Sequence, residues 1–80
     1  MPTVLRQEGF RVMIYSDDHL PMHVHVFKAD GEVIIDLGDA TTPPSVRKNT
    51  HMKRNEERRA LKIIGENQEW LIAAWRRRNG

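Results

Sequence analysis

The sequence predicts an α+β domain: a meander of three to four antiparallel strands, with a C-terminal kinked helix or helix pair packed on one face. Apolar and polar residues alternate in the first half of the chain, which is typical of strands that bury one face. The last third repeats apolar residues at helical spacing. We therefore expect a single domain over residues 1–80, with strands within 3–37, a long connection over 39–53 and helices within 55–78.

Four segments of the first half have strand character, and turn residues separate them. They are rich in β-branched and aromatic side chains and lie at 4–6, 10–16, 22–28 and 32–37. A loop is expected over 17–21, where Asp17 and Asp18 precede Pro21. The Asp30-Gly31 dipeptide is the strongest local signal, because it fits a two-residue type I′ turn.

That turn predicts a register, and the register assigns side chains to two faces. It pairs Ala29 with Glu32 and places His25 opposite Asp36. The core face would then carry Phe10, Val12, Ile14, Val24, Val26, Val33, Ile35 and Leu37. The opposite face would carry Arg11, Met13, Tyr15, His23, His25, Phe27, Ile34 and Asp36.

The second half begins with a long connection. Residues 39–53 show no periodicity and contain two prolines, so we expect a loop, either disordered or serving as a binding segment. A helix is predicted from its N-cap, Asn55, with Glu56 and Glu57 in the first turn. A break near Gly65, with Asn67 as a second N-cap, would divide it into helices at 55–65 and 67–78.

Composition limits the environment and the chemistry. The 80 residues include no cysteine, which excludes disulfides and thiolate chemistry, and no apolar run suggests a signal peptide or a membrane span. We expect a cytoplasmic protein without membrane contact. The net charge of +2 is uneven: residues 1–46 hold three basic and seven acidic residues, and residues 47–80 hold ten basic and four acidic ones.

The basic half could bind RNA, DNA or an acidic protein partner, because each would neutralise its excess charge. The alternative is that the two halves of the chain neutralise each other. The candidate contact residues lie in the predicted helices and are Arg58, Arg59, Lys62, Arg76, Arg77 and Arg78. Trp75 lies on the apolar stripe and is expected in the core, whereas Trp70 lies off it and is the better candidate for a partner contact.

Three of the four histidines fall within seven residues, and three interpretations stay open. His23 and His25 project from the same side of a strand, so they could act as general base and acid of a metal-independent nuclease. Arg11, Tyr15 and Asp36 would then stabilise or position the phosphate. Alternatively, His19, His23 and His25 would ligate zinc or nickel. The third interpretation is structural, with the histidines held by Asp36 and the loop.

The chain resembles a family of small prokaryotic proteins known as domain of unknown function 4160. The resemblance covers nearly the whole chain and is carried by the opening residues 2–6, the Pro21-x-His23-x-His25 core and the pattern over residues 66–75. It implies a compact α+β domain with a small cognate protein encoded nearby, as in toxin–antitoxin pairs.

These observations together predict a component of a bacterial toxin–antitoxin-like module that engages nucleic acid. A nuclease active site at His23 and His25 is the catalytic version of this prediction. The alternatives are a non-catalytic adaptor or regulator that binds a small acidic protein, and a small histidine-ligated metal-binding protein. A homo-oligomer is a further option.

Overall fold

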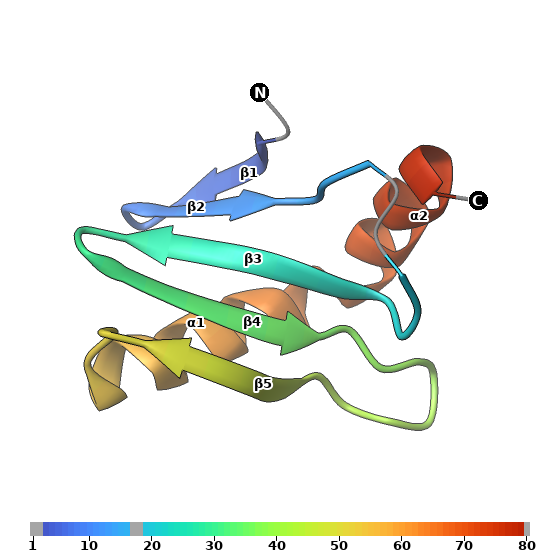
Figure 1. Ribbon diagram of the computed structural model, residues 1–80. Coiled ribbons are helices and arrows are strands. Elements are labelled where there is room, and N and C mark those ends of the chain that lie inside the picture. Colours follow the sequence, from blue (N-terminus) through green and yellow to red (C-terminus); the bar gives the residue numbers. More distant parts are fainter. Residues whose placement is uncertain (1–2, 17–18, 80) are drawn as a thin grey trace.

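The computed structural model describes residues 3–16 and 19–79, in which two helices pack against one face of an antiparallel sheet (Figure 1). The strands neighbour one another in chain order: β1 (Thr3–Gln7), β2 (Phe10–Met13), β3 (His23–Lys28), β4 (Gly31–Asp36) and β5 (Ser45–Thr50). The helices are α1 (Arg54–Glu66) and α2 (Gln68–Asn79), and neither is long and apolar enough to cross a membrane.

The α+β architecture and the helix pair are confirmed, whereas the described sheet has five strands instead of three or four. The predicted loop residues Asp17 and Asp18 lie outside the described residues.

The prediction of a loop throughout residues 39–53 is wrong, because β5 forms there and pairs with β4. Val46 is the one apolar residue of β5, so no alternation revealed the strand. A bulge disturbs the pattern further, since Ile34 lies opposite Lys48 but Ile35 lies opposite Val46, which leaves Arg47 as an extra residue. Charges and bulges are common at sheet edges, where they discourage pairing with other chains.

The β3–β4 hairpin turns one residue earlier than predicted. Lys28 pairs with Gly31, so the turn is Ala29-Asp30, with Ala29 at a φ of 51°. Gly31 is used in the strand, where an added Cβ would lie only 2.7 Å from the Met52 Cα. The predicted pairing of Ala29 with Glu32 is therefore wrong.

The pairing of His25 with Asp36 is also wrong, because the register moves by two residues. Ile34 lies opposite His25, and Asp36 lies opposite His23. A shift of two leaves every side chain on its predicted face, since strand side chains alternate with period two. Val12 lies opposite Val26, and both are buried on the predicted core face.

The core lies between the sheet and the helices. All eight residues of the predicted core face are buried, at 0–1% exposure. They pack with buried residues that the helices contribute, namely Ala60, Ile63, Ile64, Leu71, Ala74 and Trp75. Burial of apolar side chains on this scale is the main favourable term for so short a chain.

The bounds of both helices agree closely with the prediction, but the capping residues differ from those predicted. The N-cap of α1 is Lys53 rather than Asn55, while Glu56 and Glu57 do occupy the first turn. Asn67 separates the two helices. Its side-chain Nδ2 donates to the Ile63 carbonyl oxygen at 2.8 Å, so the side chain supports the end of α1 instead of capping α2.

An ion pair joins the β1–β2 turn to α1, and its contribution to stability should depend on pH. Arg59 Nε donates to Glu8 Oε1 at 2.6 Å, and this hydrogen bond lowers the pKa of Glu8. Because the pKa is lower in the folded state, the pair stabilises the protein at neutral pH, and this stabilisation is lost as the pH falls through the folded-state value.

Replacing the carboxylate should remove this acid dependence. Glu8→Gln is expected to lower the melting temperature slightly at neutral pH and to match the wild type under acidic conditions. Thermal unfolding at several pH values would test this expectation. A constant difference between the two proteins across the acid range would contradict it.

Candidate functional site

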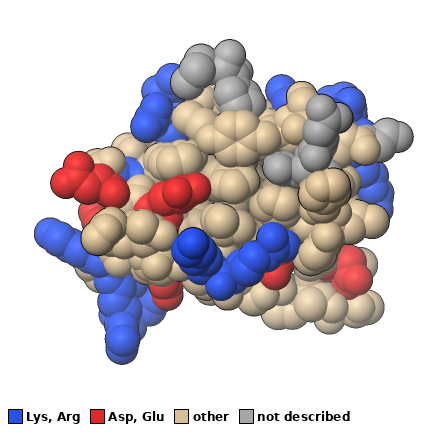
Figure 2. Space-filling view, viewed as in Figure 1, with Lys and Arg blue, Asp and Glu red and all other residues tan. Residues whose placement is uncertain are grey.

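The helices leave one face of the sheet uncovered, and we call it the open sheet face (Figure 2). Strand pairing and ring contacts place on it Arg6, Arg11, Met13, Tyr15, His23, His25, Phe27, Glu32, Ile34, Asp36 and Lys48. Figure 2 shows a central area without charge, with basic side chains above and below it and acidic ones mainly at its left. All five predicted catalytic residues lie on this face.

His25 lies at the centre of the face and contacts a side chain on each side, one from the segment after β2 and one from β4. The Tyr15 ring meets its ring edge-on, with centroids 4.7 Å apart. On the other side, His25 Nδ1 lies 3.1 Å from Glu32 Oε2. A carboxylate only accepts hydrogen bonds, so Nδ1 carries the proton in this contact. These contacts fix the orientation of the ring.

His23 is deeper, at 7% exposure, and is held by the segment before β3. Its Nδ1 donates to the Pro21 carbonyl oxygen at 2.9 Å, and its ring centroid lies 5.3 Å from that of His25. Arg47 also reaches the Pro21 carbonyl and forms an ion pair with Asp36. Asp36 is therefore paired with an arginine of the edge strand.

The predicted catalytic residues share a face but are spread along it. Arg11 lies opposite Phe27, with its guanidinium carbon 5.8 Å from the Phe27 ring centroid, whereas Asp36 lies opposite His23. These two positions are four residues apart on β3, which is about 13 Å along a strand. General acid–base catalysis needs its groups within hydrogen-bonding reach of one substrate atom. The arrangement is better suited to contacting an extended ligand.

The three histidines proposed as metal ligands do not converge. His19 is exposed in the segment before β3, apart from the two strand histidines. Across residues 3–16 and 19–79, no group of three or more His, Cys, Asp or Glu side chains is close enough to hold a metal ion. Zinc or nickel binding by His19, His23 and His25 therefore gains no support from the geometry.

The six basic residues predicted on the helices are all exposed but do not form one cluster. Arg58, Arg59 and Lys62 belong to α1, and the other three form the last turn of α2. Figure 1 places the start of α1 and the end of α2 at opposite ends of the molecule. Arg59 is engaged by Glu8, whereas the other five make no ion pair within the described part of the chain.

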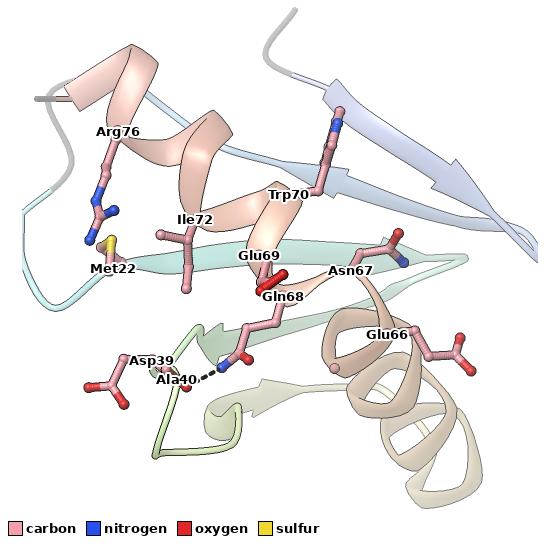
Figure 3. A pocket seen from close by; sticks show the side chains of 11 residues that line it. Met22, Asp39, Ala40, Glu66, Asn67, Gln68, Glu69, Trp70, Ile72 and Arg76 are labelled. Atoms are coloured by element: carbon pink, nitrogen blue, oxygen red, sulfur yellow. Dashed lines mark hydrogen bonds between the residues drawn. The ribbon is translucent and has the colours of Figure 1, made fainter.

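A separate groove lies where the helices meet the β4–β5 connection (Figure 3). Gln68 reaches across it toward Asp39 and Ala40, while Arg76 extends toward Met22. Trp70 borders the groove and is 49% exposed, as predicted, and Trp75 is buried in the core. Acidic side chains also line the groove, so its mixed charge does not favour a polyanion.

Six residues of the open sheet face were missing from the predicted site, and they include Phe27, Lys48 and Arg6. Phe27 was placed on the correct face, but its aromatic ring was not counted as a contact. Lys48 fell within the connection expected to be a loop, so it could not be assigned to a face. Arg6 required the register of β1 against β2, which places it directly opposite Arg11.

Comparison with known proteins identifies a family for this chain. No curated protein and no solved structure matches the chain. The model of the family described as "Domain of unknown function (DUF4160)" matches residues 9–76, which include β2 to β5, α1 and most of α2. Because the match spans most of the chain, this protein belongs to the DUF4160 family.

Proposed function

We propose that this protein binds nucleic acid as one component of a toxin–antitoxin-like module, together with a small protein encoded nearby. The observation that carries nucleic-acid binding is the excess of uncompensated cations. Of the ten Lys and Arg residues in 47–80, all except Arg47 and Arg59 are exposed and make no ion pair within the described residues. A polyanion would neutralise several of them together and release counterions. The toxin–antitoxin-like module is the role that the family resemblance implies.

The geometry favours binding over cleavage. A nuclease that used His23 and His25 would need both rings to exchange protons with a bound phosphodiester. His23 is only 7% exposed, and its Nδ1 is already committed to the Pro21 carbonyl. The two rings also contact each other, and the His25 ring contacts that of Tyr15, which suits a packed surface.

Binding to labelled nucleic acid at increasing salt concentration tests the proposal. Fluorescence anisotropy with a single-stranded RNA, a single-stranded DNA and a duplex should detect binding that weakens steeply as salt is added. Neutralising Arg76, Arg77 and Arg78 together, each to Gln, should make the slope of log K against log salt shallower by about 2 for a single strand.

The matched control removes charges without changing the net charge. The double variant Glu8→Gln/Arg59→Gln deletes one internal ion pair on the helix side and should leave the slope unchanged. If none of the three nucleic acids binds at low salt, the proposal is wrong. An adaptor that binds an acidic protein would then replace it.

A further inference from the structure

The open sheet face has an aromatic centre that no element of the described chain covers. Tyr15, His25 and Phe27 all project from this side of β3 and the segment after β2. Tyr15 is 37% exposed, and His25 and Phe27 are partly buried by their neighbours. Side chains two residues apart on a strand lie about 7 Å apart on the same face. The rings therefore form a short row rather than a compact core.

Apolar side chains fill the spaces around these rings. Met13 is 5% exposed, and Ile34 is partly buried beside His25 on the neighbouring strand. The solvated face of an antiparallel sheet normally carries polar residues. An uncovered face with an apolar and aromatic centre is typical of an interaction site.

The charges of this face favour an anionic ligand. Its two acidic residues are already engaged, Glu32 by His25 and Asp36 by Arg47. Arg6, Arg11 and Lys48 make no ion pair within the described residues. The basic side chains therefore leave a positive margin around the aromatic centre (Figure 2).

One pair in this margin is unfavourable without a ligand. Arg6 and Arg11 are directly opposite each other on β1 and β2, and like charges in this position destabilise a sheet. A bound anion between or beside them would relieve the repulsion. Arg11 also lies over the Phe27 ring, so a phosphate held by this guanidinium would bring its base close to an aromatic surface.

We propose that the open sheet face binds a single-stranded nucleic acid, with unpaired bases against Tyr15, His25 and Phe27 and phosphates at Arg6, Arg11 and Lys48. The inference rests on the proposed function and adds to it a second contact surface, on the side of the sheet away from the basic helices, together with the class of nucleic acid. Unpaired bases are required because the bases of a duplex are already stacked on one another and cannot lie flat on protein rings. A polar protein surface would neutralise the cations, but it would offer no flat groups to stack on Tyr15, His25 and Phe27.

The test compares ring variants that keep their apolar bulk. Tyr15→Leu and Phe27→Leu should each weaken binding of single-stranded RNA or DNA by roughly tenfold, the scale expected for losing one stacked base. The salt slope should stay as in the wild type, because neither change removes a charge. Any weak duplex binding should also be unchanged.

Trp70→Leu is the matched control, since Trp70 is a more exposed aromatic residue but lies on the helix side of the molecule. It should bind as the wild type does. Circular dichroism melting would establish that each variant is folded, and the exposed Tyr15 makes that substitution the safer of the two.

The failure of this inference differs from the failure of the proposed function. If both ring variants bind as tightly as the wild type, the inference is overturned, whereas binding by the basic helices survives. An equal loss of affinity in Trp70→Leu would also overturn it. If the wild type binds no nucleic acid at low salt, both proposals fall together.

Discussion

Gly38→Ala is expected to lower the free energy of unfolding by about 2–5 kcal/mol, from backbone strain together with overpacking. Gly38 has a φ of 70°, a conformation that residues with a side chain adopt at a cost. A Cβ added there would lie 2.2 Å from the Thr42 carbonyl oxygen. This oxygen belongs to the backbone bridge between Asp39 and Thr42, so it cannot move away freely.

The same substitution at Gly65 is the control and should have the opposite sign. Gly65 lies within α1, and a Cβ there meets no atom within 4 Å. Gly65→Ala should therefore raise stability by up to about 1 kcal/mol through helix propensity. Urea denaturation of both variants would measure the two effects. If Gly38→Ala unfolds at the wild-type midpoint, the backbone around Gly38 does not have the conformation described above.

The two faces of the sheet could be predicted because strand side chains alternate strictly. The hairpin register was wrong by two residues, yet His25 still lies on the open sheet face and Val24 in the core. An error of one residue would have exchanged the faces. The pattern is therefore informative about burial even where the turn was placed incorrectly.

The fifth strand could not be predicted, because the charges and the bulge that suit an edge strand also remove the alternation by which a strand is recognised. Val46 alone packs toward the core, and Arg47 sits in a bulge that interrupts the alternation. Pairing of β5 depends on β4 and on the connection before it, which are not local properties. Sequence patterns within a short window carry little information about such pairing.

The candidate site was predicted as a set of residues but not as a set of contacts. Arg11, Tyr15 and His25 share a face because of their spacing. That His25 contacts Glu32 and Asp36 contacts Arg47 depends on the register and on the bulge in β5. With these partners, both acidic groups of the face are engaged, and the aromatic rings lie between cations that make no ion pair within the described residues.

The β4–β5 connection determines where β5, and with it Lys48, joins the open sheet face. The side chain of Gln68, the first residue of α2, holds this connection from the other side of the sheet. Its Nε2 donates to the carbonyl oxygens of Leu37, Asp39 and Thr42, at 2.8, 3.0 and 3.1 Å. One amide group thus links the end of β4, the connection and the helix pair.

Gln68→Ala should consequently destabilise the protein by about 1–3 kcal/mol, the cost of leaving partly buried carbonyl groups without their donor. Because the connection would loosen first, hydrogen exchange of the β5 amides should accelerate more than that of β3. Urea denaturation and exchange measured by mass spectrometry would test these two expectations. Unchanged exchange in β5 would show that Gln68 does not hold the connection.

Gln68→Glu tests whether the donated hydrogens are the cause, because it keeps the size of the side chain. An ionised carboxylate would face three carbonyl oxygens and repel them, so the loss of stability at neutral pH should be at least that of Gln68→Ala. The surroundings favour the protonated form of the new group, which raises its pKa in the folded state. The deficit should therefore be smallest in acid and grow as the pH rises through that pKa, whereas the deficit of Gln68→Ala relative to the wild type should stay constant. Parallel pH profiles for the two variants would attribute the effect to lost packing rather than to the three hydrogen bonds.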